Sequence, residues 1–291
     1  MIHFLHRKRK MIFRLLLAAF FLGIFAAWIV GGLLCASANH SVALPKNLAV
    51  EPVTFPSKSG ATISGWLVQG ATNRGIVILQ HGVRADKSTL VERAKFLSQA
   101  GYTVLMFDFQ AHGESLGHVI TLGFLESRDS RAAVEFAKKR FPGKPIGVIG
   151  VSLGAAAAAL ANPPLDVQAL VLEMMYPTVE EATKDRIEMR LGRLGRCLSP
   201  LLTTQIPFRA GCNAEDLSPI RAVAKITASK LFLAGTADRE TKFSEAEAIF
   251  SNAAEPKTFR AFDGAQHEDL NHFAPEQYQK IVLDFLETHL K

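Results

Sequence analysis

The sequence predicts an α/β domain in which helices cover both faces of a mostly parallel sheet. From Ala49 onward, apolar runs of strand length alternate with segments of helical periodicity. The run GIVILQ at 75–80 is typical of a strand that is buried on both faces, as strands of parallel sheets are. About 250 residues follow the N-terminal segment, and this length fits one large domain.

The predicted strands and helices follow one another regularly along the chain. Strands are predicted at 61–68, 75–80, 102–107, 146–150, 167–173, 231–234 and 258–262. Helices are predicted at 90–97, 130–140, 153–161 and 278–285. The alternation stops between 173 and 230, a stretch longer than an ordinary crossover. In sheets of this kind, functional residues lie just beyond the carboxyl ends of the strands.

The N-terminal segment predicts a membrane anchor. Residues 1–14 form a basic flank, and residues 15–35 are expected to form a transmembrane helix or an uncleaved signal. The uncharged stretch 15–34 has the roughly 20 residues needed to cross the hydrocarbon core. A small-x-small pattern at 36–38 resembles a cleavage site, but the apolar region of a signal peptide usually spans only about 7–15 residues. A retained anchor is therefore favoured.

The position of the basic flank predicts the orientation of the chain in the membrane. Positive residues before the apolar stretch place the N-terminus in the cytoplasm and the domain on the extracytoplasmic side, as a single-pass membrane protein. Cleavage of the segment would instead release a secreted protein. Residues 36–48 are predicted as a linker and residues 49–291 as the α/β domain, with an insertion at about 176–228.

The net charge of +6 arises from the N-terminal flank. Five of the 33 basic residues lie in that flank, so 28 basic and 27 acidic residues remain in the rest of the chain. The domain is therefore nearly neutral, and no nucleic-acid partner is predicted.

The three cysteines do not make a disulfide framework in a chain of this length. Cys197 and Cys212 could pair in an oxidising compartment, or they could be two independent buried thiols. No CxxC or HExxH spacing occurs, so neither a metal site nor a cofactor is expected.

Two G-x-S-x-G sequences contain a candidate nucleophile. In this motif the serine occupies a strained strand-to-helix turn, and glycines two residues away relieve the crowding. Ser152 in GVSLG directly follows a predicted buried strand and precedes an alanine-rich helix. Ser115 in GESLG is followed by no helical pattern. The context favours Ser152 as the nucleophile and Ser115 as a loop residue near the site.

Two further side chains have the positions that a serine nucleophile requires. A serine hydroxyl needs a base to accept its proton, and that base needs an acid that fixes its orientation. His267 lies in a glycine-containing loop after the last predicted strand, and Asp238 follows the strand before it. We expect His267 to be the base and Asp238 the acid. Glu173 is the reserve acid, and His272, toward the start of the last helix, is the alternative histidine.

The expected oxyanion hole consists of two backbone N–H groups. Leu153 supplies the first, because it directly follows Ser152 at a helix N-terminus where the helix dipole favours negative charge. Val83, in the loop after the strand 75–80, is expected to supply the second. His81 in the same loop is interpreted as a structural histidine.

Five short motifs lie at the ends of predicted strands. They are HGV at 81–83, DFQAHGES at 108–115, GVSLG at 150–154, GTAD at 235–238 and GAQH at 264–267. Together they resemble the α/β-hydrolase superfamily, particularly its membrane-anchored, lipase- and peptidase-like serine hydrolases, over about residues 50–290. The resemblance implies a mostly parallel central sheet of about eight strands with helices on both faces. It also implies that the insertion is a small cap over the site.

The resemblance implies hydrolysis of an ester, thioester or amide bond through an acyl-enzyme, with a Ser-His-Asp triad. The expected substrate is a small or lipid-like acyl compound. Gln110, Ala111 and His112 depart from the D-x-R-G-x-G-x-S pattern of many relatives, so the loop beside the site is expected to differ in shape. The alternative function is a non-catalytic, hydrolase-like binding protein at the membrane.

The insertion carries a predicted basic face. Arg186, Arg190 and Arg193 lie on one side of a helix. One interpretation is a surface for anionic lipid headgroups or an acidic substrate. The favoured interpretation is a solvated helix face that nearby carboxylates partly neutralise. These carboxylates belong to Glu180, Glu181, Asp185 and Glu188.

Overall fold

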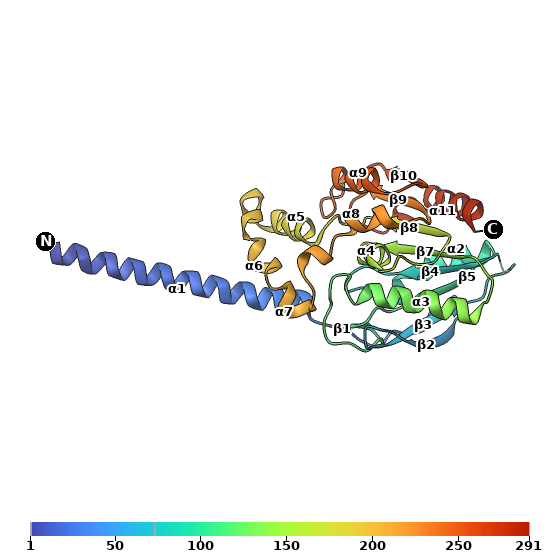
Figure 1. Cartoon of the computed structure of the whole chain (residues 1–291), viewed down its shortest axis with the longest axis horizontal. Helices are drawn as coiled ribbons and strands as arrows, with labels where there is room; N and C mark the ends of the chain where they lie inside the picture. The colour runs from blue at the N-terminus through green and yellow to red at the C-terminus, as the bar shows by residue number, and fades with distance from the viewer. Residues whose placement is uncertain (1, 73, 291) are drawn as a thin grey trace.

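The computed structural model describes residues 2–72 and 74–290 and contains an α/β domain with a long N-terminal helix (Figure 1). The main sheet has eight strands in the order β10-β9-β8-β7-β4-β5-β3-β2. β3 is antiparallel to β2 and β5, and the other neighbours are parallel. The predicted, mostly parallel sheet is confirmed. The bounds are β2 (Glu51–Pro56), β3 (Thr62–Val68), β4 (Ile76–Gln80), β5 (Thr103–Phe107), β7 (Ile146–Val151), β8 (Ala169–Glu173), β9 (Ser229–Gly235) and β10 (Lys257–Phe262).

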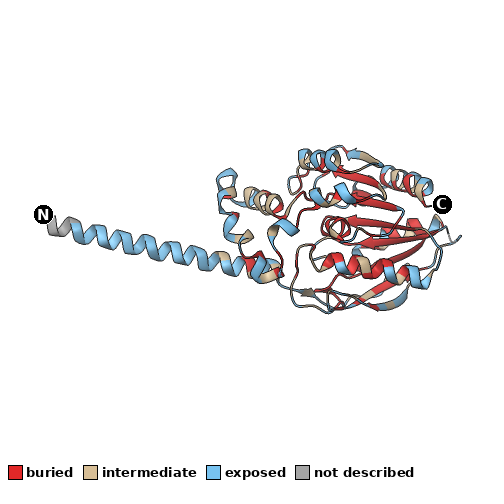
Figure 2. Ribbon diagram, viewed as in Figure 1, coloured by how far each residue is buried: buried red, intermediate tan, exposed pale blue. Residues whose placement is uncertain are grey.

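Helices pack on both faces of this sheet. Side chains of β4 alternate between two apolar cores: Ile76 and Ile78 face α3, α4 and α9, whereas Val77 and Leu79 face α2 and α11. The central strands are accordingly buried along their length (Figure 2). Burial on both faces explains why β4 is a continuous apolar run in the sequence. The bounds are α2 (Val91–Gln99), α3 (Glu126–Arg140), α4 (Leu153–Leu160), α9 (Phe243–Asn252) and α11 (Pro275–His289).

Among the strands of the main sheet and the long helices that pack on it, β2 and α9 have no counterpart among the predicted elements. β2 is an edge strand that contains two prolines and has a mostly exposed surface, so it forms no apolar run. α9 buries only Ala246 and Ile249, which is too few for a clear apolar stripe. α3 begins four residues earlier than predicted, at Glu126, whose buried carboxylate accepts hydrogen bonds from Thr121 and Gly123.

The N-terminal helix α1 (Ile2–Cys35) extends away from the domain as an exposed rod (Figures 1 and 2). Its segment His6–Cys35 contains an 18-residue window with a mean hydropathy of 2.3 and is long and apolar enough to cross a membrane, by length and composition. A signal sequence has the same properties, so the helix is compatible with an anchor or a signal.

The segment after α1, predicted as a linker, is hydrogen-bonded to the domain. β1 (Ala38–Asn39) pairs in parallel with β6 (His112–Gly113), and the Ala38 N–H donates to the Ala111 carbonyl at 2.7 Å. Backbone pairing over two residues leaves no periodic pattern in the sequence, which is why the attachment was not predicted.

The insertion at 176–228 forms short helices on the side of the domain where α1 joins it, and we name these residues the cap (Figure 1). Val179, Ile206, Ala210 and Leu217 bury a small core of its own. The helical segments are α5 (Val179–Leu191), α6 (Pro200–Thr203), α7 (Ile206–Ala210) and α8 (Pro219–Ala222). They are joined by 3-10 turns at η2 (Arg193–Leu198), η3 (Ala214–Asp216) and η4 (Val223–Lys225).

All three cysteines are free, so the pairing of Cys197 with Cys212 is wrong. The alternative of two buried thiols holds for Cys212 alone, because Cys197 is exposed. Cys212 lies in the cap core and Cys197 on an outer turn, so a spacing that suits a disulfide does not bring the thiols together. Burial raises the pKa of the Cys212 thiol to about 11.

An ion-pair cluster joins the cap to the domain. Asp185 on α5 is buried, and one of its carboxylate oxygens accepts hydrogen bonds from Lys242 at 2.6 Å and from Arg196 at 2.7 Å. Glu188 accepts from the same two side chains at 3.1 and 2.7 Å. Because Lys242 directly precedes α9, these bonds attach α5 to the domain.

The predicted basic face of the cap is only partly neutralised. Arg186 forms an ion pair with Glu240 of the domain at 3.2 Å. Arg190 and Arg193 are exposed, and neither forms an ion pair with any residue that the structure describes. The positive charges of Arg190 and Arg193 therefore remain exposed on the surface of the cap.

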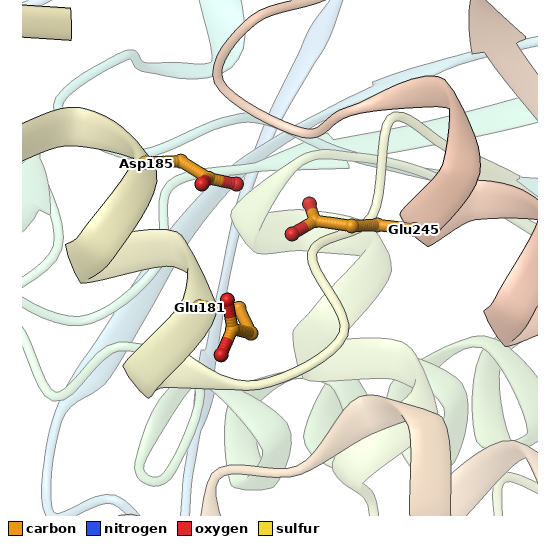
Figure 3. A group of neighbouring side chains, drawn as sticks. All are labelled: Glu181, Asp185 and Glu245. Carbon is orange, nitrogen blue, oxygen red and sulfur yellow. The ribbon is translucent and has the colours of Figure 1, made fainter. Parts of the chain in front are cut away.

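Glu245 of α9 faces the cap across this cluster (Figure 3). Glu181, Asp185 and Glu245 each place one oxygen within 4.8 Å of the others. The second oxygen of Asp185 is buried and has no hydrogen-bond partner among the described residues. Burial and, after it, the neighbouring Asp185 carboxylate raise the pKa of Glu245 to about 8. A protonated Glu245 can donate a hydrogen bond to Asp185.

Glu245→Gln is expected to stabilise the protein in mildly alkaline solution. The pKa of Glu245 is about 8 in the folded state and 4.5 ordinarily, so between these values the folded state holds a proton that the unfolded state has lost. The stabilisation from that proton is fully present at pH values below the pKa that Glu245 has in the unfolded state. It is lost as the pH rises through the pKa that Glu245 has in the folded state. The amide keeps its donor, so the melting temperature of the variant should exceed that of the unchanged protein by a few degrees at about pH 9.

The matched control is Glu247→Gln, an exposed carboxylate on the same helix. It changes the net charge equally without contact to the cluster. If the melting temperatures of the Glu245 and Glu247 variants change in the same way from about pH 5 to 9, Glu245 does not hold a proton that it donates to Asp185.

Candidate active site

Ser152 occupies a strained turn between β7 and α4. Its backbone has φ 52° and ψ −107°, a conformation that residues with a side chain rarely adopt. A Cβ at position 150 would lie 2.5 Å from the Ala155 nitrogen, and a Cβ at position 154 would lie 2.4 Å from the Gln80 carbonyl oxygen. The two glycines of the motif are therefore required by close backbone approaches on both sides of the serine.

The structure brings Ser152, His267 and Asp238 together. The Oγ of Ser152 lies 3.0 Å from Nε2 of His267, and Nδ1 of His267 lies 2.7 Å from Oδ2 of Asp238. The other Asp238 oxygen accepts hydrogen bonds from the N–H groups of Glu240 at 2.8 Å and Thr241 at 3.0 Å. These bonds fix the carboxylate so that Oδ2 faces the imidazole.

The strand order explains how distant segments meet here. β7, β9 and β10 are parallel strands of one sheet, so their carboxyl ends lie at the same edge. Ser152 directly follows β7, Asp238 follows β9, and His267 follows β10 in the loop before α10 (Leu270–Phe273). Ser152 and Asp238 are buried, and the His267 side chain is 15% exposed, so the histidine is reachable from solvent.

The two expected oxyanion donors lie beside the serine. Leu153 is the first residue of α4, and Val83 follows Gly82, whose added Cβ would lie 3.8 Å from the Ser152 Cβ. Among the described residues, neither the Leu153 nor the Val83 N–H donates a hydrogen bond within the chain. Both donors are therefore free to bind an oxygen atom that carries negative charge.

The rival serine and the structural histidine have structural contacts. Ser115 is buried, donates to the Asp108 carbonyl at 2.6 Å and accepts from the Ser64 N–H at 2.9 Å. His81 accepts from the Phe109 N–H at 3.1 Å, and burial lowers its pKa to about 3. His81 is therefore neutral, and both side chains bond backbone groups of neighbouring segments.

The reserve acid Glu173 lies in a buried network that the sequence did not predict. Arg93 of α2 donates to Glu173 at 2.8 Å and pairs with Asp269 at 2.9 Å, and Tyr278 also bonds Glu173. Asp269 lies two residues after His267, and the Ser152 N–H donates to the Glu173 carbonyl at 2.8 Å. Arg93 thus links the serine turn to the histidine loop. In the sequence Arg93 is a single charged residue within the predicted helix 90–97, and no motif distinguishes it from an exposed arginine.

His272, the alternative histidine, is exposed on α10, while His267 carries both hydrogen bonds of the site.

The loop that departs from the pattern of relatives is ordered by Gln110. Its side chain donates to Glu126 at 2.9 Å and to the Val119 carbonyl at 2.7 Å. A glutamine therefore anchors this loop to α3.

This geometry fits nucleophilic attack by a serine. His267 can accept the Ser152 proton through Nε2, while Asp238 holds the ring and stabilises the imidazolium that forms. The two free N–H groups can stabilise negative charge on an attacked carbonyl oxygen.

Gly154→Ala is expected to destabilise the protein by about 1–3 kcal/mol, because the new methyl group meets the Gln80 backbone and cannot be accommodated by a side-chain rotation. Chemical denaturation of the full chain in detergent measures this change. Gly82→Ala is the control, since its Cβ makes only an ordinary contact at 3.8 Å. Equal midpoints for the two variants would contradict the steric account of the motif.

Part of the chain matches a known family model. Residues 71–207 match the family described as serine aminopeptidase, S33. The matched region contains Ser152 and ends before Asp238 and His267.

Known proteins with similar sequences and structures agree with this match. YqkD of Bacillus subtilis, an uncharacterized protein, is 24% identical over 238 residues, which cover 80% of this chain and 78% of YqkD. A monoglyceride lipase homolog of monkeypox virus is 23% identical over 249 residues, covering 74% of this chain and 88% of that protein. The esterase Pf2001 of Pyrococcus furiosus superposes with a TM-score of 0.72 at 23% identity, covering 88% of this chain and 99% of the esterase. These similarities support a hydrolase, and the superposition shows that the chain has the α/β-hydrolase fold.

Proposed function

We propose that this chain is a serine hydrolase that cleaves an ester, thioester or amide bond through an acyl-enzyme intermediate. The observation that carries the proposal is the continuous hydrogen-bond chain from Ser152 through His267 to Asp238, at 3.0 and 2.7 Å. Ser152 is the nucleophile, His267 the general base and Asp238 the acid that orients the histidine.

The reaction proceeds in two halves. The Oγ of Ser152 attacks the substrate carbonyl carbon while His267 takes up its proton, and the Val83 and Leu153 N–H groups bind the oxyanion. The intermediate collapses, and His267 protonates the departing alcohol, thiol or amine. Water then attacks the acyl carbon of the acyl-serine and gives a proton to His267. When this second intermediate collapses, the bond to Ser152 Oγ breaks, His267 returns the proton to Oγ, and the acid is released.

The proposed setting is a membrane surface. α1 acts as a retained single-pass anchor, with the basic flank in the cytoplasm and the domain on the extracytoplasmic side. Its apolar length and exposure support this role. The substrate is a small or lipid-like acyl compound that reaches the domain at this surface.

A fluorophosphonate probe tests the nucleophile. The unchanged full chain should be labelled under native conditions, and Ser152→Ala should abolish labelling, because the probe reacts only with an activated serine. Ser251→Ala, at an exposed position on α9, is the matched control and should be labelled like the unchanged protein. A natively folded chain that stays unlabelled favours the non-catalytic binding protein.

Asp238→Asn is expected to lower kcat by on the order of 10³–10⁴, because the amide holds His267 in the wrong tautomer and does not stabilise the imidazolium. The rate is measured with p-nitrophenyl esters and aminoacyl amides on the same preparation, with Ser152→Ala as background. A variant that keeps the kcat of the unchanged protein would exclude Asp238 as the acid. The better of the two substrate series identifies the leaving group.

A further inference from the structure

The cap packs against α1 inside the apolar stretch of that helix. The Gln205 side chain donates to the Ala27 carbonyl at 3.0 Å, and the Arg209 guanidinium lies 4.4 Å from the centre of the Trp28 ring. The Gln205 side chain lies close against α1 at Gly31, where an added Cβ would be 2.2 Å from the Gln205 Oε1. Polar side chains of the cap are therefore satisfied by backbone carbonyls of α1.

These contacts fix the level of the cap along α1. The uncharged stretch 15–34 matches the roughly 30 Å of a hydrocarbon core. Ala27 lies seven residues before the end of that stretch, which is about 10 Å along a helix axis. When residues 15–34 span the hydrocarbon core of the bilayer, α6 and α7 lie about 5–10 Å below the headgroup boundary, which is the depth that interfacial helices reach.

The cap also exposes apolar side chains. Ten large apolar side chains are exposed outside α1 among the described residues, and six of them lie between positions 189 and 208. Leu194 is 89% exposed and Phe208 is 79% exposed, with the Phe208 ring 6.3 Å from that of Trp28. The six, which we name the apolar cap surface, are Met189, Leu191, Leu194, Leu198, Leu201 and Phe208.

Charge on the cap fits an anionic surface. Arg190 and Arg193 lie between members of the apolar cap surface and form no ion pair with the described residues. Long basic side chains beside exposed leucines and an aromatic ring are typical of surfaces that rest at the headgroup level of anionic lipid.

The C-terminal end of α1 is bonded directly to the domain. Arg84, next to Val83, donates to the carbonyls of Leu33, Leu34 and Ala36 at the C-terminal end of α1, the last two at 3.4 and 3.2 Å. The Ile120 N–H donates to the Cys35 carbonyl at 2.8 Å. A cation at a helix C-terminus satisfies carbonyls that have no partner within the helix. These bonds therefore couple the tilt of α1 to the position of the domain.

We propose that the apolar cap surface inserts into the outer layer of an anionic phospholipid bilayer beside α1. The inference rests on the proposed role of α1 as a membrane anchor, and it does not depend on the proposed serine chemistry. The contact holds the loop of Val83 near the bilayer, because the neighbouring Arg84 is bonded to the end of α1. Acyl substrates dissolved in the bilayer then lie close to the site.

The test places a fluorescent dye on the cap of the full chain in vesicles of phosphatidylcholine with a minority of phosphatidylglycerol. Cys35→Ser and Cys212→Ala leave the exposed Cys197 for labelling. The matched sample adds Cys197→Ser and Thr288→Cys, which moves the dye to the exposed end of α11, remote from α1 (Figure 1). Lipids with a nitroxide near the headgroup should quench the cap dye at least about twofold more than the dye at position 288.

Two sets of variants separate apolar insertion from charge attraction. Leu194→Glu with Phe208→Glu should reduce the quenching of the cap dye by roughly half or more in both anionic and pure phosphatidylcholine vesicles. Arg190→Glu with Arg193→Glu should reduce it in anionic vesicles only, because headgroup charge is the partner of these arginines.

Flotation of the vesicles distinguishes the ways in which the proposal can fail. Equal quenching at both dye positions in protein that floats with the vesicles overturns the cap contact and leaves the anchor intact. Protein that does not float overturns the anchor as well, while fluorophosphonate labelling still reports the chemistry. Crosslinking through Cys197 between two copies without lipid quenching assigns the surface to a second copy and overturns the proposal.

Discussion

The two hydrogen bonds of His267 hold together segments that lie 115 and 29 residues away along the chain. Their geometry depends on the backbone around Ser152, which is held at φ 52° by close contacts on both sides. Strain of this kind persists only where the surrounding structure over-determines it. Here β7 lies between β4 and β8 in the sheet centre, and α4 packs directly on β7, so the turn cannot relax.

A buried charge network holds this turn in position. Arg93 is 2% exposed and bonds Glu173 at the end of β8 as well as Asp269 in the histidine loop. A buried guanidinium without partners would be strongly destabilising, so the three groups must be positioned together. Because Glu173 also accepts from the Ser152 N–H through its carbonyl, one network restrains both the serine turn and the histidine loop. Among the described residues, the Glu173 carboxylate bonds Arg93 and Tyr278, whereas His267 bonds Asp238.

The sequence predicted the features that single residues or strong periodicity determine. Buried parallel strands leave long apolar runs, and the strained turn requires glycines at fixed spacing, so the central sheet and Ser152 could be predicted. β2 and α9 could not, because an edge strand and a mostly exposed helix bury too little to leave a pattern. Arg93 could not either, since its partners lie 80 and 176 residues away. The exposure of the Cys197 thiol could not be predicted either, because it depends on the orientation of the short turn η2.

The cap connects α1 to the loop that contains Asp238. At one end, Gln205 and Arg209 bind the backbone and ring of α1; at the other, Arg186 pairs with Glu240, whose N–H donates to Asp238. The Asp185 cluster holds α5 and α9 together between these contacts. A displacement of the cap would therefore act on Asp238 through the Glu240 backbone, and the contacts of the cap with α1 restrain that displacement. In this arrangement α1 and the orientation of the His267 side chain are linked by a continuous series of contacts.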